Sequence, residues 1–135
     1  MASILKVDTL TGVTTAGSIS VTGEGNSTTT NLQQGLAKAW TNLNMSSGTY
    51  RDSLNIASAT DNGTGDFTNN YTSAMANVNY NHEYTQFENG RTGGYLLSNY
   101  GTYVTASLMR GRARGSGGGL SDSDYVGLTV HGDLA

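Results

Sequence analysis

Hydrophobic and polar residues alternate along much of the second half of the chain. Gly, Asn and Asp residues divide the alternation into five runs, at residues 54–57, 67–71, 78–84, 104–108 and 126–130. Successive side chains of a strand point to opposite faces, so each run predicts a β-strand with one buried face. Five such strands indicate an antiparallel sandwich or barrel, and we expect a β-sandwich over residues 46–135.

The first thirty residues predict short strands without a core of their own. Alternating runs occur at residues 4–7 and 18–22, and each is too short to enclose a buried interior. Fixing the backbone of one residue costs roughly 1–2 kcal/mol, which the few large aliphatic side chains of this segment cannot offset over its length. The segment therefore needs another surface, and identical copies of the chain are the simplest candidate.

One short helix is predicted after these strands. Thr30 and Gln33 have the spacing of a capping box, in which the threonine hydroxyl accepts a hydrogen bond from the Gln33 amide. Apolar side chains then recur at steps of four, four and three, on one side of a helix: Leu32, Leu36, Trp40 and Leu43. This stripe packs either on the chain's own sheet or against identical helices around a threefold axis. The coreless strands before it favour the threefold arrangement.

These patterns divide the chain into two parts. Residues 1–45 are expected to form a strand-plus-helix segment that oligomerises and anchors the protein, and residues 46–135 to form the β-sandwich module. The residues expected at the oligomer interface are apolar residues of the first part: Ile4, Leu5, Val7, Leu32, Leu36, Trp40 and Leu43.

The composition suits short strands and tight turns, and it excludes several protein classes. Gly, Thr, Ser and Asn fill nearly half of the 135 positions, whereas charged residues make up only 13%. The absence of cysteine excludes disulfides and thiolate-bound metals, and no apolar run approaches the ~20 residues of a membrane helix. A net charge of −3 argues against nucleic-acid binding as the main function.

The acidic, glycine-rich segment from Asp61 to Asp66 has two interpretations. Oxygen ligands at alternate positions around a glycine are typical of a calcium loop, but the distal Glu of such a loop is lacking. Asp-Asn-Gly and Gly-Asp are also hairpin-turn residues. The strands predicted on both sides favour the hairpin.

The sequence carries no recognisable catalytic motif. His82 and His131 are the two histidines, and His82 shares the face of its run with tyrosines, so a packed imidazole is favoured over a ligand. A nucleophile elbow, a zinc-protease helix motif and a phosphate-binding loop are all missing from the sequence. We therefore expect a protein that is not an enzyme and that holds no cofactor or metal.

Three arginines lie close together ahead of a run of glycines: Arg110, Arg112 and Arg114. The segment predicts a flexible, exposed loop between two strands. Guanidinium groups bind anions, so these arginines are also the candidate surface-contact residues, either for an acidic neighbouring subunit or for an anionic cell-surface glycan.

Several blocks of the sequence resemble small virion proteins of marine tailed bacteriophages. Residues 3–10 (SILKVDTL) are similar to the start of many such proteins, and residues 28–40 (TTTNLQQGLAKAW) to their helical link. Three further blocks resemble the β module of phage tail-fibre-type proteins, and a fourth resembles their C-terminal end: residues 51–56, 60–68, 72–75 and 130–134. The resemblance does not extend over residues 87–119.

The resemblance implies a structural protein of the virion, usually trimeric, on a tail or capsid appendage. We accordingly expect a homotrimeric tail or fibre-like component that is assembled in the host cytoplasm and contacts other virion proteins. Its trimer would multiply weak contacts with a host cell-surface glycan, and we expect neither nucleic-acid binding nor membrane insertion. Two alternatives are a capsid decoration (cement) protein that stabilises the phage head and a monomeric carbohydrate-binding β-sandwich module.

Overall fold

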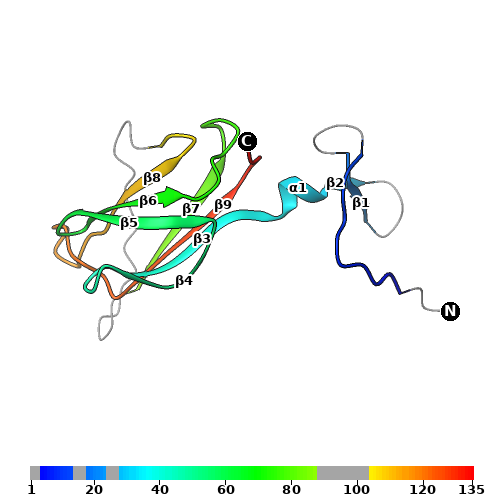
Figure 1. The fold of residues 1–135 in the computed structure, drawn as a ribbon. Helices are drawn as coiled ribbons and strands as arrows, with labels where there is room; N and C mark the ends of the chain where they lie inside the picture. The colour runs from blue at the N-terminus through cyan, green and yellow to red at the C-terminus, as the bar shows by residue number, and fades with distance from the viewer. Residues whose placement is uncertain (1–3, 14–17, 24–27, 88–103) are drawn as a thin grey trace. The chain divides into compact units, whose positions relative to one another are not determined.

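The computed structural model describes residues 4–13, 18–23, 28–87 and 104–135 (Figure 1). In these ranges the chain is mainly β, with antiparallel sheets and one very short helix, as the sequence predicts. It divides into two compact units, Met1–Leu36 and Ala37–Ala135. The division therefore falls earlier in the chain than the boundary expected after residue 45.

The strands and the helix take their labels from chain order. They are β1 (Ser20–Thr22), β2 (Thr29–Asn31), α1 (Leu32–Gly35), β3 (Ala37–Asn44), β4 (Thr49–Leu54), β5 (Ile56–Gly63), β6 (Asp66–Tyr71), β7 (Asn81–Phe87), β8 (Leu108–Arg112) and β9 (Tyr125–His131).

The N-terminal unit holds a small antiparallel strand pair and one helical turn. β1 pairs with β2 in a register that joins Ser20 to Asn31, and α1 follows directly. Asn31 caps this helix, because its side-chain oxygen accepts a hydrogen bond from the Gln34 amide at 3.1 Å. The capping role predicted for Thr30 thus belongs to the next residue, whose extended backbone is the conformation of an N-cap.

The helix predicted over residues 32–43 is wrong beyond its first turn. α1 ends at Gly35, and the following residues form β3, in which Ala39, Thr41 and Leu43 are buried at a period of two. The apolar steps of four and three were compatible with a helix but do not exclude a strand. Pairing on both edges of β3, with β4 and with β9, outweighs the local helical preference.

The C-terminal unit contains two antiparallel sheets, which Figure 1 shows as two layers. One has the strand order β4-β3-β9-β7, and the other has the order β5-β6-β8. Both sheets contribute side chains to the same two hydrophobic clusters, so the core lies between them. The buried members are Ala39, Tyr71, Met75, Tyr80, Met109, Leu128 and Val130 in one cluster, and Leu43, Met45, Phe67, Ala113 and Val126 in the other.

Two of the predicted strands are confirmed where they were expected, and a third is split in two. The runs at residues 67–71 and 126–130 fall within β6 and β9. The run at residues 54–57 is interrupted by Asn55, whose positive φ of 57° ends β4 before β5 begins. The Asn55 side chain fixes this reversal, since it donates to the Ser73 carbonyl and accepts from the Ser73 amide.

The other two predicted strands begin later than expected. The run at residues 78–84 enters a sheet only at Asn81, and the run at residues 104–108 gives way to β8, which begins at Leu108. Val104 makes only an isolated bridge with Met109. Pairing of β8 with β6, which is distant in the chain, decides which of these residues join the sheet.

Candidate functional site

The arginine segment is not the flexible loop that the sequence predicts. Arg110 and Arg112 lie in β8, on the strand that pairs with β6. Nε of Arg110 donates to Oδ1 of Asp66 at 2.6 Å, and Nε of Arg112 donates to Oδ2 of the same carboxylate at 2.9 Å. Both guanidinium groups are therefore engaged by an acidic residue of their own chain.

Arg114 is also held by the surrounding structure. Its Nη1 donates to the Gly118 carbonyl at 2.7 Å, and its own carbonyl accepts a hydrogen bond from the Gln86 side chain at 2.8 Å. The segment from Arg110 to Arg114 thus belongs to the sheet and to the loop that follows it. These contacts are structural, and they weaken the case for an anion-binding loop.

Asp66 is the electrostatic centre of the outer face of the three-stranded sheet. The hydrogen bond from Arg110 lowers the pKa of Asp66, and Arg112 acts in the same direction against the opposing effect of burial. Asn62 donates to Asp66 Oδ1 at 3.3 Å and to Thr68 Oγ1 at 3.0 Å. The negative charge of Asp66 is therefore balanced by side chains of the same chain.

The acidic, glycine-rich segment forms the predicted hairpin. Gly63 pairs with Asp66 across a two-residue turn made of Thr64 and Gly65. Gly65 has a φ of 66°, and a Cβ there would lie 2.5 Å from the Ala113 carbonyl oxygen, so the turn requires glycine. The carboxylate of Asp66 faces two guanidinium groups, which is unsuitable for a calcium ligand.

The histidine of β7 is packed, as the sequence indicates. His82 lies between two tyrosine rings, with centroid distances of 6.3 Å to Tyr80 and 6.1 Å to Tyr84. Burial lowers the pKa of His82, which favours the neutral imidazole. Among the residues that the structure describes, no three His, Cys, Asp or Glu side chains come together as a metal site.

A buried polar network connects the two sheets of the C-terminal unit. Asn69 of β6 is fully buried, accepts a hydrogen bond from the Tyr50 hydroxyl at 2.6 Å, and donates to the Tyr84 hydroxyl at 3.5 Å. Burial raises the pKa of both tyrosines. Both neutral hydroxyls form hydrogen bonds with the Asn69 amide. The network therefore fixes how the sheets pack rather than providing a reactive group.

A groove of about 540 Å³ lies on the outer face of the four-stranded sheet. Its floor and walls come from β3, β7 and β9. The residues that line it are Trp40, Thr41, Asn42, Thr85, Gln86, Phe87, Tyr125, Gly127, Leu128 and Thr129. None of these residues is Asp, Glu, Lys, Arg or His, so the groove combines aromatic rings with amides and hydroxyls.

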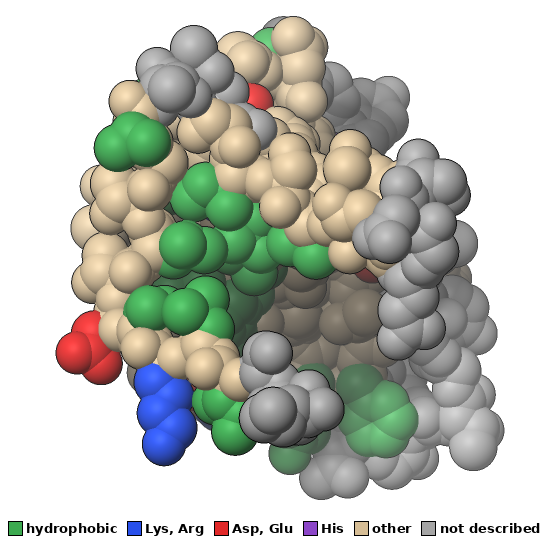
Figure 2. Space-filling model, turned by 90° about the vertical axis from the view of Figure 1, so that its right-hand side faces the viewer, with side chains coloured by type: hydrophobic (Ala, Val, Ile, Leu, Met, Phe, Trp, Pro, Cys, Tyr) green, Lys and Arg blue, Asp and Glu red, His purple; other side chains and the backbone are tan. Residues whose placement is uncertain are grey.

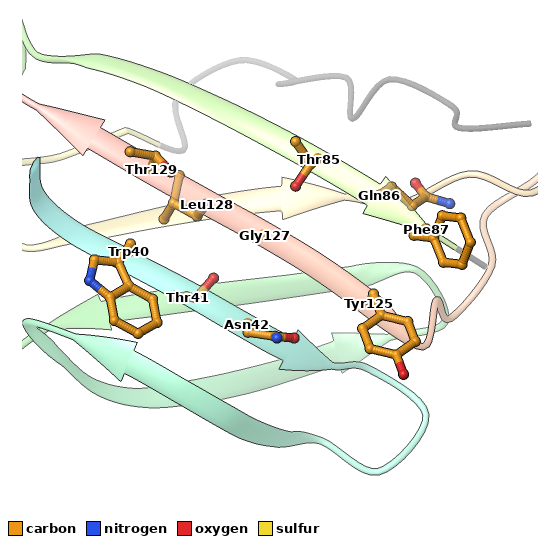
Figure 3. A pocket seen from close by; sticks show the side chains of 10 residues that line it. All are labelled: Trp40, Thr41, Asn42, Thr85, Gln86, Phe87, Tyr125, Gly127, Leu128 and Thr129. Carbon is orange, nitrogen blue, oxygen red and sulfur yellow. The ribbon is translucent and has the colours of Figure 1, made fainter. Parts of the chain in front are cut away.

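Strand register explains the shape of this groove (Figure 3). Trp40 is paired with Thr129 at one end, and Phe87 is paired with Tyr125 at the other. Gly127 lies midway between them on β9, and the hydroxyl of Thr85 points toward it. Because glycine carries no side chain, the Thr85 hydroxyl lies over Gly127, in the middle of the floor between the aromatic ends.

Tyr125 is held in place from two directions. The guanidinium carbon of Arg51 lies 3.9 Å from the centre of its ring, and Phe87 meets it edge-on with centroids 6.1 Å apart. Arg51 also donates to the Asp124 carbonyl. Phe87 and Tyr125 nevertheless remain 60% and 41% exposed, which is unusual for side chains of this size.

The residues predicted for an oligomer interface are separated by the structure. Leu43 is buried in the core and Trp40 lies in the groove, so neither shares a helical stripe with Leu32 or Leu36. The remaining predicted residues lie in the N-terminal unit, where several large aliphatic side chains are exposed: Ile4, Leu5, Val7, Leu10, Val13, Val21 and Leu36. Figure 2 shows hydrophobic side chains gathered among polar ones on the face turned toward the viewer.

The groove is the site that sequence reasoning missed. A partial signal was present, since Tyr125 and Gly127 occupy the outward positions of the last alternating run. Assignment of Trp40 to a helix removed the aromatic residue at the other end. The register that places β3, β9 and β7 side by side joins segments that are far apart in the sequence, so local sequence patterns do not reveal it.

Comparison with protein-family models, with curated proteins and with solved structures finds no match to this chain. In the described ranges, no helix has the length and hydrophobicity that crossing a bilayer requires. Function is therefore inferred from the sequence and from the residues of each unit taken by itself.

Proposed function

We propose that this chain is a non-enzymatic structural protein of a bacteriophage virion, a homotrimeric tail or fibre-like appendage component. The N-terminal unit would anchor it and hold three copies together, and the C-terminal unit would project as a β-sandwich formed by its two sheets. The sequence blocks that resemble phage virion proteins support this assignment, and they occur in both units.

The exposed aliphatic side chains of the N-terminal unit carry the proposal. Ile4 and Leu5 are 78% and 79% exposed, and the other large aliphatic residues there, apart from half-buried Ile19 and Leu32, are also exposed. Burying apolar surface contributes roughly 25 cal/mol per Å², so a unit that leaves these side chains in water forgoes its main source of stability. Association with identical copies or with another virion protein would supply the missing core.

The proposed division of roles agrees with how each unit uses its hydrophobic residues. The C-terminal unit buries its own two clusters between its sheets. It can therefore remain folded while it extends away from its anchor. A capsid decoration protein would use the same trimer against the shell of the head.

Sedimentation equilibrium of the full chain at micromolar concentration tests the trimer. We expect a mass three times the 14.1 kDa of the chain. Val7→Asp should dissociate the trimer, whereas Val78→Asp should not, and these two valines are similarly exposed, at 57% and 55%. A stable, folded monomer of the unaltered chain would overturn the proposal.

Location on the particle requires a second measurement. Imaging of purified particles, combined with quantification of the copies per particle, should place the protein on the tail at low copy number. A copy number that matches the capsid lattice would instead identify a decoration protein. Absence from purified particles would contradict both assignments.

A further inference from the structure

We infer that the groove on the four-stranded sheet binds a neutral oligosaccharide, stacked between Trp40 at one end and Tyr125 at the other. This inference goes beyond the proposed function. The site lies wholly within the C-terminal unit, so it does not depend on whether the chain trimerises or where it sits on a particle.

Aromatic rings are the first argument for a sugar ligand. The faces of aromatic rings carry negative potential, and the C–H faces of a sugar ring are apolar and weakly positive, so the two stack favourably. Trp40, Tyr125 and Phe87 bring three such rings to one surface from three adjacent strands. Because Phe87 and Tyr125 are largely exposed, their surfaces are accessible to a ligand.

The length of the groove favours a chain of sugars over a single ring. Trp40 stands opposite Thr129, and Tyr125 lies four residues away from Thr129 on the same strand. Four residues of β-strand span roughly 13 Å at about 3.3 Å per residue. The volume of about 540 Å³ lies within the usual range of small-molecule sites.

Polar groups between the rings match the hydroxyls of such a ligand. Asn42 and Thr85 are paired with Gly127 from opposite sides, so an amide and a hydroxyl lie in the middle of the floor. The Gln86 amide is already bonded to the Arg114 backbone, but Thr129 adds a second hydroxyl to the lining. These groups both donate and accept hydrogen bonds, as sugar hydroxyls do.

Charge distinguishes a neutral glycan from an acidic one. The lining contributes no Lys, Arg, Asp or Glu. Arg51, at the rim, is stacked on Tyr125 and donates to the Asp124 carbonyl and to Oδ1 of Asn42, so its guanidinium group is engaged within the chain. A sulfated or uronic acid chain would find no complementary cation in the lining.

Tyr125 is already positioned for stacking. Arg51 lies over one face of its ring, and Phe87 meets the ring edge-on. A side chain that is fixed before the ligand arrives loses little conformational entropy on binding. The ring would thus act as a rigid platform at the end of the groove.

The single tryptophan of the chain provides a direct measurement. The full-length protein is titrated with cellohexaose, maltohexaose, mannohexaose and N-acetylchitohexaose, and with a heparin hexasaccharide for comparison. We expect at least one neutral hexasaccharide to shift the emission of Trp40 in a saturable manner and the heparin fragment to leave it unchanged. Failure of all neutral glycans, here and on a printed glycan array, would overturn the inference, as would preferential binding of heparin.

Variants of Tyr125 test the stacking itself. Tyr125→Ala should weaken binding of the responding hexasaccharide at least tenfold, whereas Tyr125→Phe, which keeps the ring, should stay within about threefold of the original affinity. Leu134→Ala is the matched control, because Leu134 is 40% exposed against 41% for Tyr125 and does not line the groove. Unchanged affinity in Tyr125→Ala would overturn the site.

Sedimentation of the same variants separates this inference from the proposed trimer. Tyr125→Ala should sediment as the unaltered chain does. A loss of oligomer mass in that variant would identify the face as an interface between copies and would exclude the glycan site. Loss of glycan binding with the oligomer intact supports the site, whatever the oligomeric state is.

Discussion

The two sheets of the C-terminal unit present outer faces of opposite character. On the three-stranded sheet, Asp66 is enclosed by Arg110, Arg112 and Asn62, so the charges of this face are paired within the chain. On the four-stranded sheet, three aromatic rings line a groove, and two of them, Phe87 and Tyr125, remain exposed. The comparison teaches that the clustered arginines, which attract attention in the sequence, stabilise the fold, whereas the groove on the other sheet has a lining without charged side chains.

The largest effect should come from removing the acidic centre of the paired face. Asp66→Ala leaves two partly buried guanidinium groups without their carboxylate, and we expect the free energy of unfolding to fall by about 2 kcal/mol. Urea denaturation followed by circular dichroism measures this change. Asp61→Ala is the control in the same hairpin, because Asp61 is exposed and its side chain accepts a hydrogen bond from the Gly63 amide rather than from a guanidinium group. Equal losses in the two variants would contradict the central role of Asp66.

Acid titration should show the same contribution through its pH dependence. The pKa of Asp66 is lower in the folded chain than its ordinary value, so its stabilising effect is complete above pH ~4 and is lost as the pH falls through the folded value. The difference in melting temperature between the unaltered chain and Asp66→Asn should therefore be constant at neutral pH and shrink below pH ~4. A difference that persists undiminished in strong acid would argue against the ion pair.

The two arginines should differ in their contributions. Arg110 makes two hydrogen bonds to Asp66, at 2.6 and 2.8 Å, whereas Arg112 makes one, at 2.9 Å. We expect Arg110→Gln to cost about 1–1.5 kcal/mol of stability and Arg112→Gln about 0.5 kcal/mol, because bidentate pairs are the stronger ones. Denaturation curves of both variants test this order. Neither substitution should alter the shift of Trp40 emission that oligosaccharides cause. Loss of that shift would show that the two faces do not have separate roles.

The smallest effect on stability is expected on the aromatic face. Phe87 is 60% exposed, so Phe87→Ala should change the free energy of unfolding by no more than about 0.5 kcal/mol, as is usual for exposed positions. The same variant should weaken binding of a neutral hexasaccharide. A large loss of stability in Phe87→Ala would show that this face is structural like the other one.

Sequence reasoning succeeded where one face of a strand is buried and the period of two is uninterrupted. The runs at residues 67–71 and 126–130 are strands, and the glycines after Asp61 form the expected hairpin. Sequence reasoning failed where the pattern was compatible with both a helix and a strand. The apolar steps from Leu32 to Leu43 predicted a helix, but β3 forms there because it pairs on both edges.

Composition and periodicity were enough to predict the fold class. Small polar residues, alternating runs and turn-forming glycines indicate a mainly β chain, and its sheets are antiparallel. The sequence also located a coreless N-terminal segment, since short apolar runs are visible without any partner strand. Tertiary structure alone decided which side chains meet. Asp66 pairs with arginines more than forty positions away, and Trp40, Gly127 and Phe87 share one groove only through strand register. Local periodicity indicates which face of a strand is buried, but long-range strand pairing determines which residues lie beside that strand.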